Sequence, residues 1–203
     1  MPDLINEKFA VTRFLNALEM PFRSLEHGDK PDFVLDIGDQ KIGLEVCDTT
    51  PEEYHRVAKV LHKKLWPACV DVGNLQHRSQ RRPTPEIISE VTSANVQWQG
   101  TGEIHERWRM GMKRRLDDKE RAFQNVEFSR FDQNWLLIQD AVTAPLENSS
   151  DLHHMDMNLQ YLLSTFAPLV YFDKVWLDFG QNGLVEWSIH ERQMTWKYLN
   201  LSS

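Results

Sequence analysis

The sequence predicts one α/β or α+β domain spanning residues 1–203, with helices on both sides of a central mixed β-sheet. Short apolar runs with strand spacing alternate along the chain with longer runs that have helical spacing. The run Asn134–Asp140 is almost continuously apolar, as in a strand that is covered on both faces. With 41% hydrophobic and 26% charged residues, the chain has the composition of an ordinary globular domain.

The chain begins with a predicted helix over Asn6–Leu18, followed by a short strand over Phe22–Glu26. Glu7 falls on the apolar side of this helix by the rotation of about 100° per residue. An ionised carboxylate there is costly unless it has a partner. Acids are also common in the first turn of a helix, so Glu7 has an ordinary structural interpretation as well.

A β-hairpin follows, because Gly38-Asp39 between two alternating runs is the pattern of a two-residue hairpin turn. This turn fixes the register, so that Phe33 faces Leu44 on the apolar side. On the other side, Asp32 faces Glu45. Like charges directly opposite each other are destabilising, and a divalent cation between them would offset that cost. The alternative is a pair of solvated carboxylates on the wet face of the hairpin.

The rest of the chain is assigned from the same signals of capping, periodicity and turns. The predicted elements are a helix over residues 51–66, a loop over 75–84, a short helix over Pro85–Ala94, a long charged helix over Glu103–Phe123, a strand over 134–140, a helix over Asp151–Phe166, and strands over Leu169–Phe179 and Leu184–Ile189.

The long charged helix carries one conspicuous lysine. Its apolar stripe is formed by Trp108, Met112, Leu116 and Phe123, and Lys119 falls within about 20° of the centre of that stripe by helical spacing. A lysine in this position can extend its charged end to the edge of the stripe. It can also be held in a cleft beside carboxylates, and this is the functional interpretation.

An inward glutamate on the first helix, Pro31-Asp32 at the start of the hairpin, and Glu45 on its second strand together resemble the PD-(D/E)XK nuclease superfamily. The resemblance implies a restriction-endonuclease-like three-layer αβα core: a helix, three antiparallel strands, a crossover helix and a fourth strand. Residues 50–102 would then be a largely helical insertion. The sequence departs from the family signature two residues after Glu45, where Cys47 replaces the lysine. Lys119 on the crossover helix is the first candidate for a displaced lysine, and Lys41 is the second.

The resemblance implies a metal-dependent nuclease that hydrolyses phosphodiester bonds, with DNA the favoured substrate. Asp32, Glu45 and the backbone carbonyl of Val46 would bind Mg²⁺ or Mn²⁺, and Glu7 would act directly or through water. Lys119 would orient the nucleophile or stabilise the developing charge. Clustered basic side chains would contact the nucleic-acid backbone. These side chains include Arg78, Arg81, Arg82, Lys113 and Arg114, within the wider groups 78–82 and 107–115.

Two other functions stay open. The missing strand lysine also suits a catalytically inactive protein of the same fold that binds nucleic acid or a protein partner. A metal site at His153-His154-Met155-Asp156 is a weaker alternative, because adjacent helical residues point about 100° apart.

Charge and the absence of targeting signals limit the expected partners and cellular location. The net charge of −7 argues against indiscriminate nucleic-acid binding but not against binding along one face. No membrane span, signal peptide or zinc-type cysteine spacing is visible, so we expect a cytoplasmic protein. A homodimer is compatible with cleavage of duplex DNA, but no sequence signal decides it.

Overall fold

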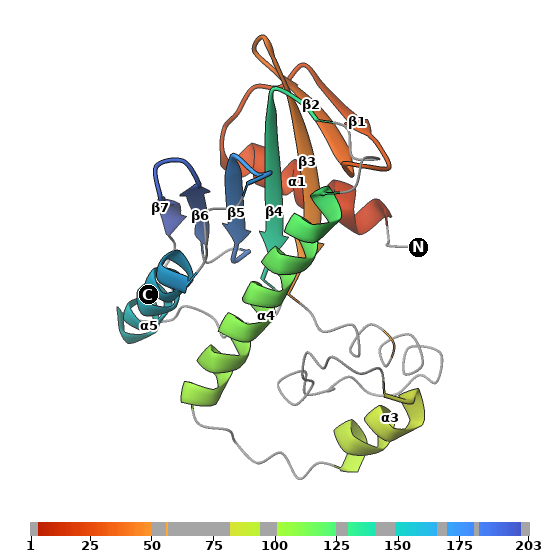
Figure 1. Cartoon of the computed structure of the whole chain (residues 1–203), viewed down its shortest axis with the longest axis vertical. Helices are drawn as coiled ribbons and strands as arrows, with labels where there is room; N and C mark the ends of the chain where they lie inside the picture. Colours follow the sequence, from red (N-terminus) through yellow and green to blue (C-terminus); the bar gives the residue numbers. More distant parts are fainter. Residues whose placement is uncertain are drawn as a thin grey trace.

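A seven-stranded mixed sheet forms the centre of the structure (Figure 1). The computed structural model describes residues 4–49, 56, 82–93, 101–124, 130–140, 149–165, 170–180 and 183–199. The strands lie side by side in chain order, and β3, β4 and β5 are parallel while the other neighbours are antiparallel. Their bounds are β1 Ser24–His27, β2 Phe33–Ile37, β3 Gln40–Asp48, β4 Gln133–Gln139, β5 Lys174–Asp178, β6 Gly183–Ser188 and β7 Gln193–Leu199.

Helices cover both faces of this sheet. Helix α1 (Leu4–Ala17) packs on one face through Val11, Phe14 and Leu15. Helices α4 (Thr101–Phe123) and α5 (Ser149–Thr165) pack on the other face, and α4 connects β3 to β4 in the chain (Figure 1). The predicted α/β class, with a mixed sheet between helices, is therefore confirmed.

The two faces bury separate apolar clusters. On the α1 side, Leu44 and Val46 of β3 join Trp135 and Trp176 in one cluster. On the α4 side, Trp108, Met112 and Leu116 of α4 pack against the alternate residues of β4 and β5. Since successive strand residues point to opposite faces, Glu45 lies on the α4 side of β3.

The hairpin has the predicted register: Phe33 pairs with Leu44, and Ile37 pairs with Gln40 across Gly38-Asp39. The predicted helices over 6–18, 85–94, 103–123 and 151–166 correspond to α1, α3 (Thr84–Ser93), α4 and α5 within a few residues. Apart from Arg56, the predicted helix over 51–66 lies outside the described residues, as do most of the loop over 75–84 and most of the expected insertion over 50–102.

Two strand predictions were wrong in part. The strand expected over Leu169–Phe179 begins only at Lys174, because Phe172 is buried by packing into the core and not by strand pairing. Strand β7 was not predicted, although Met194, Trp196 and Tyr198 alternate with polar residues and give the usual signal of a half-buried strand. No helix among the described residues is long and apolar enough to cross a membrane.

Candidate catalytic site

The site lies beside the first residue of β2, where β3 extends beyond it. Phe33, the first residue of β2, pairs with Leu44, so the last four residues of β3 extend beyond their antiparallel neighbour. Thr49 donates its N–H to Gln139 on the β4 side. Backbone groups alternate in direction along a strand, so the N–H and C=O groups of Val46 and Asp48 point away from β4. They face the side where β2 does not extend. These groups need side-chain partners.

Asp32 supplies the first of these partners. Its Oδ2 accepts a hydrogen bond of 2.8 Å from the backbone N–H of Val46. In return, the backbone N–H of Asp32 donates to Oε2 of Glu45 at 3.3 Å. The preceding Pro31 packs on Gly43, where an added Cβ would stand only 3.0 Å from the proline Cγ. The predicted neighbourhood of Asp32 and Glu45 is thus present, held by two reciprocal hydrogen bonds.

Lys119 reaches the same place from α4. Its Nζ lies 2.5 Å from Oε1 of Glu45 and 3.3 Å from the backbone oxygen of Val46. The side chain of Glu45 is 7% exposed and that of Lys119 is 21% exposed, so the ion pair is largely removed from water. The buried stripe Trp108, Met112 and Leu116 anchors α4 on the sheet. The aliphatic part of Lys119 therefore runs along the sheet, and its charged end meets the carboxylate.

Burial dominates the electrostatics of Glu45. It raises the pKa of that carboxyl above its usual value; the charge of Lys119 opposes this shift and the charge of Asp32 adds to it. Burial on its own lowers the pKa of Lys119, but the negative charges that Cys47, Glu45 and Asp32 carry when ionised outweigh it. The pKa of Lys119 is therefore raised, and the lysine is an ammonium at neutral pH.

Cys47 carries no charge in this site at neutral pH, so Glu45 and Asp32 supply the negative charge that faces Lys119 there. Burial raises the pKa of its thiol to about 12, so the thiol stays protonated at neutral pH. Cys47 lies on the same face of β3 as Glu45 and packs against the apolar cluster under α4. The small thiol therefore lies two residues after Glu45 on the strand, and Lys119 brings the ammonium from the helix above.

Lys41, the second candidate for the displaced lysine, lies elsewhere. It pairs in register with Asp36 at the turn end of the hairpin, and it is exposed. Four strand residues separate it from Glu45, which is about 13 Å along the strand. Lys119, and not Lys41, is thus the lysine at the two carboxylates.

Four of the predicted residues lie together. Asp32, Glu45, Val46 and Lys119 form one contact network. Glu7 is half-buried on α1, the helix that covers the opposite face of the sheet from Glu45 and Lys119.

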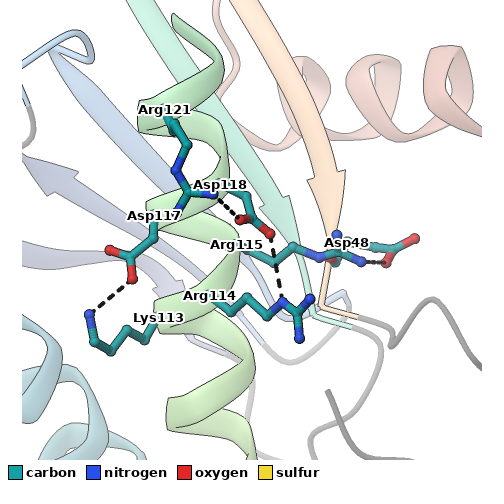
Figure 2. Close-up of polar contacts among 7 residues, drawn as sticks. All are labelled: Asp48, Lys113, Arg114, Arg115, Asp117, Asp118 and Arg121. Carbon is teal, nitrogen blue, oxygen red and sulfur yellow. Dashed lines mark hydrogen bonds and ion pairs between the residues drawn. The ribbon is translucent and has the colours of Figure 1, made fainter. Parts of the chain in front are cut away.

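The predicted nucleic-acid contacts on α4 are paired with acids of the same helix. Lys113 Nζ lies 3.0 Å from Asp117 Oδ2, and Arg114 Nε lies 3.8 Å from Asp118 Oδ2 (Figure 2). Such exposed pairs contribute only about 0.3–0.5 kcal/mol each, so a phosphate could displace the acid. Arg78 and Arg81 lie outside the described residues. The backbone oxygen of Arg82 accepts a hydrogen bond from Arg56 at 2.8 Å.

Arg115 behaves differently from its two basic neighbours. It turns toward Asp48 at the end of β3 (Figure 2), and its Nε donates to the backbone oxygen of that residue at 2.8 Å. The sequence grouped it with the basic cluster. Its spacing of four residues from Lys119, which places both on one flank of α4, was the signal that could have separated it.

The histidine alternative gains no support. His153 and His154 are exposed on α5, and Asp156 accepts a hydrogen bond from Trp196 Nε1 at 3.1 Å. Among the residues that the structure describes, no group of three His, Cys, Asp or Glu side chains is arranged to hold a metal ion.

Comparison of the chain with protein-family models, with curated proteins and with solved structures finds no match.

Proposed function

We propose that this chain is a metal-dependent nuclease with a restriction-endonuclease-like core, which hydrolyses phosphodiester bonds of nucleic acid, with DNA as the favoured substrate. The element order supports the fold assignment. Helix α1 precedes three antiparallel strands, β1–β3, and the crossover helix α4 leads to β4, which is parallel to β3. This is the order that the resemblance in the sequence implies.

The observation that carries the proposal is the contact of Lys119 with Glu45 beside Asp32. An ion pair this deeply buried is weak support for stability, because removing two charges from water costs several kcal/mol per ion. Two carboxylates and one ammonium converging from three elements are instead the groups that phosphodiester hydrolysis needs. We therefore attribute the arrangement to chemistry.

The donor set fits a divalent cation. Two carboxylates and a backbone carbonyl are hard oxygen ligands, which Mg²⁺ and Mn²⁺ prefer. Asp32, Glu45 and the carbonyl of Val46 would hold the ion, which supplies Lewis acidity toward the phosphate and lowers the pKa of a bound water.

Lys119 has a defined task in this proposal. Its ammonium contacts Glu45 and the carbonyl of Val46, so it lies beside the oxygens where a scissile phosphate would be bound. There it donates hydrogen bonds to a phosphate oxygen or to the attacking water and offsets the charge that develops. Glu45 holds the ammonium in place, and Asp32 is in turn held by the N–H of Val46.

A cleavage assay tests the proposal. Plasmid DNA, single-stranded DNA and RNA are incubated with the protein in Mg²⁺ or Mn²⁺, using wild type, Asp32→Asn, Glu45→Gln and Lys119→Met. We expect wild type to cleave and all three variants to lose at least about 100-fold in rate, the scale of losing one such charged donor. Arg23→Gln, an exposed change of the same charge beside the hairpin turn, is the matched control.

Metal binding is measured separately by calorimetric titration with Mn²⁺. Asp32→Asn and Glu45→Gln should weaken it, whereas Lys119→Met should strengthen it by removing a competing positive charge. Nucleic-acid binding by wild type without any cleavage in either metal would contradict the proposal. It would favour the inactive binding protein of the same fold, the account that the cysteine at position 47 supports.

A further inference from the structure

We propose that Arg115 is a positioning residue, which fixes α4 along β3 so that Lys119 stays against Glu45. The inference rests on the proposed function for its catalytic consequence only. The positional claim stands on the contacts of Arg115 and Lys119 with the overhanging end of β3.

The two side chains bind matching points on helix and strand. Four residues separate Arg115 from Lys119, which is a rise of about 6 Å along α4. Their backbone acceptors, the carbonyl oxygens of Val46 and Asp48, are two residues apart on β3, or about 6.6 Å. Both carbonyls face the side on which β2 is missing. Two contacts with this common spacing prevent α4 from sliding along the strand. A single contact would not prevent this movement.

The acceptor of Arg115 is part of the sheet. Its Nε lies 2.8 Å from the Asp48 carbonyl oxygen, whereas its NH2 lies 3.8 Å from the Asp48 carboxylate (Figure 2). A backbone carbonyl in a paired strand cannot rotate away as a surface carboxylate can. The Arg115 side chain is also only 26% exposed, unlike those of Lys113 and Arg114. The carbonyl contact is therefore the anchor.

The kinetic test compares Arg115→Met, Arg115→Lys and Asp48→Asn. In Arg115→Met we expect kcat to fall about 10- to 100-fold with KM little changed, since small displacements of a catalytic group have effects of this size. Arg115→Lys keeps a donor for the carbonyl and should restore most of the rate. Asp48→Asn keeps the carbonyl and should stay near wild type. A fall in Asp48→Asn as large as in Arg115→Met would overturn the carbonyl as the anchor.

A second readout does not depend on cleavage. Reductive methylation of the metal-free protein, followed by peptide mass spectrometry, measures how readily Lys119 reacts. Lys119 should react several-fold faster in Arg115→Met than in wild type. In Arg121→Met its rate of methylation should equal that of wild type, because the Arg121 side chain is exposed on the same helix. Arg115→Gln is a second removal variant that keeps the test available if Arg115→Met does not fold.

The two readouts separate the two proposals. Faster methylation of Lys119 in a protein that never cleaves would keep the positioning role and reject the nuclease. Unchanged methylation in folded Arg115→Met and Arg115→Gln would overturn the positioning role, whatever the protein cleaves.

Discussion

At the scale of single residues, the Glu45–Lys119 pair is a costly choice for a folded core. Its side chains are mostly buried, and a hydrophobic pair of similar volume would avoid the loss of hydration. The pair should therefore reduce the free energy of unfolding relative to a neutral replacement, which is the expected signature of a site kept for its chemistry.

The corresponding prediction concerns stability. Lys119→Met alone should lower the free energy of unfolding by about 3–5 kcal/mol, because it leaves the Glu45 carboxylate buried without its cation. The double variant Glu45→Gln, Lys119→Met should have a free energy of unfolding equal to that of wild type or up to about 1–4 kcal/mol higher. Urea denaturation at neutral pH measures both. The exposed pair Lys113–Asp117, replaced by Met and Asn, is the control and should change stability by less than about 1 kcal/mol. A double variant as unstable as Lys119→Met would show that the pair is structural.

The pH dependence of stability gives a second prediction at this scale. The pKa of Glu45 is raised by burial, so the folded state holds the proton to a higher pH than the unfolded state does. The contribution of Glu45 is thus most favourable below its unfolded pKa and is lost as the pH rises through the folded pKa.

Removing the carboxyl should remove this slope. Between about pH 4.5 and neutrality, Glu45→Gln should gain stability relative to wild type as the pH rises. Urea denaturation at several pH values measures the difference between the two proteins. A constant difference across this range would mean that the pKa of Glu45 is not raised in the folded protein.

At the scale of elements, the site depends on the unequal lengths of β2 and β3. The overhang of β3 leaves the backbone groups of Val46 and Asp48 without a neighbouring strand, and Asp32, Lys119 and Arg115 bind them. The lysine can therefore come from α4, because it is held by the overhanging strand end as well as by Glu45.

This argument predicts that the lysine can be placed on β3 instead of α4. Cys47 and Glu45 share a face of the strand, and the side chain of Lys119 occupies the space above them. Cys47→Lys in a Lys119→Met background should recover a measurable part of the cleavage rate that Lys119→Met loses. The assay is plasmid cleavage in Mg²⁺, with folding checked by circular dichroism.

The single variant Cys47→Lys is the control for this exchange. In the presence of Lys119 it adds a second buried cation to a filled space, so it should destabilise the protein and give no gain in rate. If the combined variant is folded and binds Mn²⁺ but stays inactive, Lys119 does more than provide a charge beside Glu45.

Local rules explain which parts of the site could be predicted. The turn at Gly38-Asp39 fixes the register that brings Asp32 opposite Glu45, and helical spacing places Lys119 beside the buried stripe of α4. The role of Arg115 could not be predicted in this way. Its acceptor is a backbone carbonyl, available only because β2 begins at Phe33 while β3 continues to Asp48.

The wrong strand assignments have a similar cause. Burial of Phe172 gave an apolar run that looks like a strand, but the paired strand begins only at Lys174. The alternation of Met194, Trp196 and Tyr198 is a sequence signal for β7, whereas pairing between distant segments decides where β5 begins. A single sequence shows the apolar pattern but not this pairing.

At the scale of the whole molecule, a net charge of −7 opposes the approach of nucleic acid, so the proposed binding would depend on one local face. Among the described residues, helix α4 is the candidate for this nucleic-acid-binding face, because Lys113 and Arg114 are exposed on it. Their charges are offset by Asp117 and Asp118, one helical turn further along (Figure 2). These acids should therefore weaken binding more than acids elsewhere do.

The last prediction compares acids that change the net charge equally. In an Asp32→Asn background, which prevents cleavage, Asp117→Asn and Asp118→Asn should each strengthen DNA binding. Glu191→Gln changes the net charge by the same amount at the exposed turn between β6 and β7, so it should have a smaller effect. Lys113→Gln and Arg114→Gln should weaken binding on all sequences and each lower the salt slope by about 0.9, the value for one lost phosphate contact. Fluorescence anisotropy over a salt series measures these slopes. Equal effects of all three acidic substitutions would mean that only the overall charge matters, and that α4 does not face the nucleic acid.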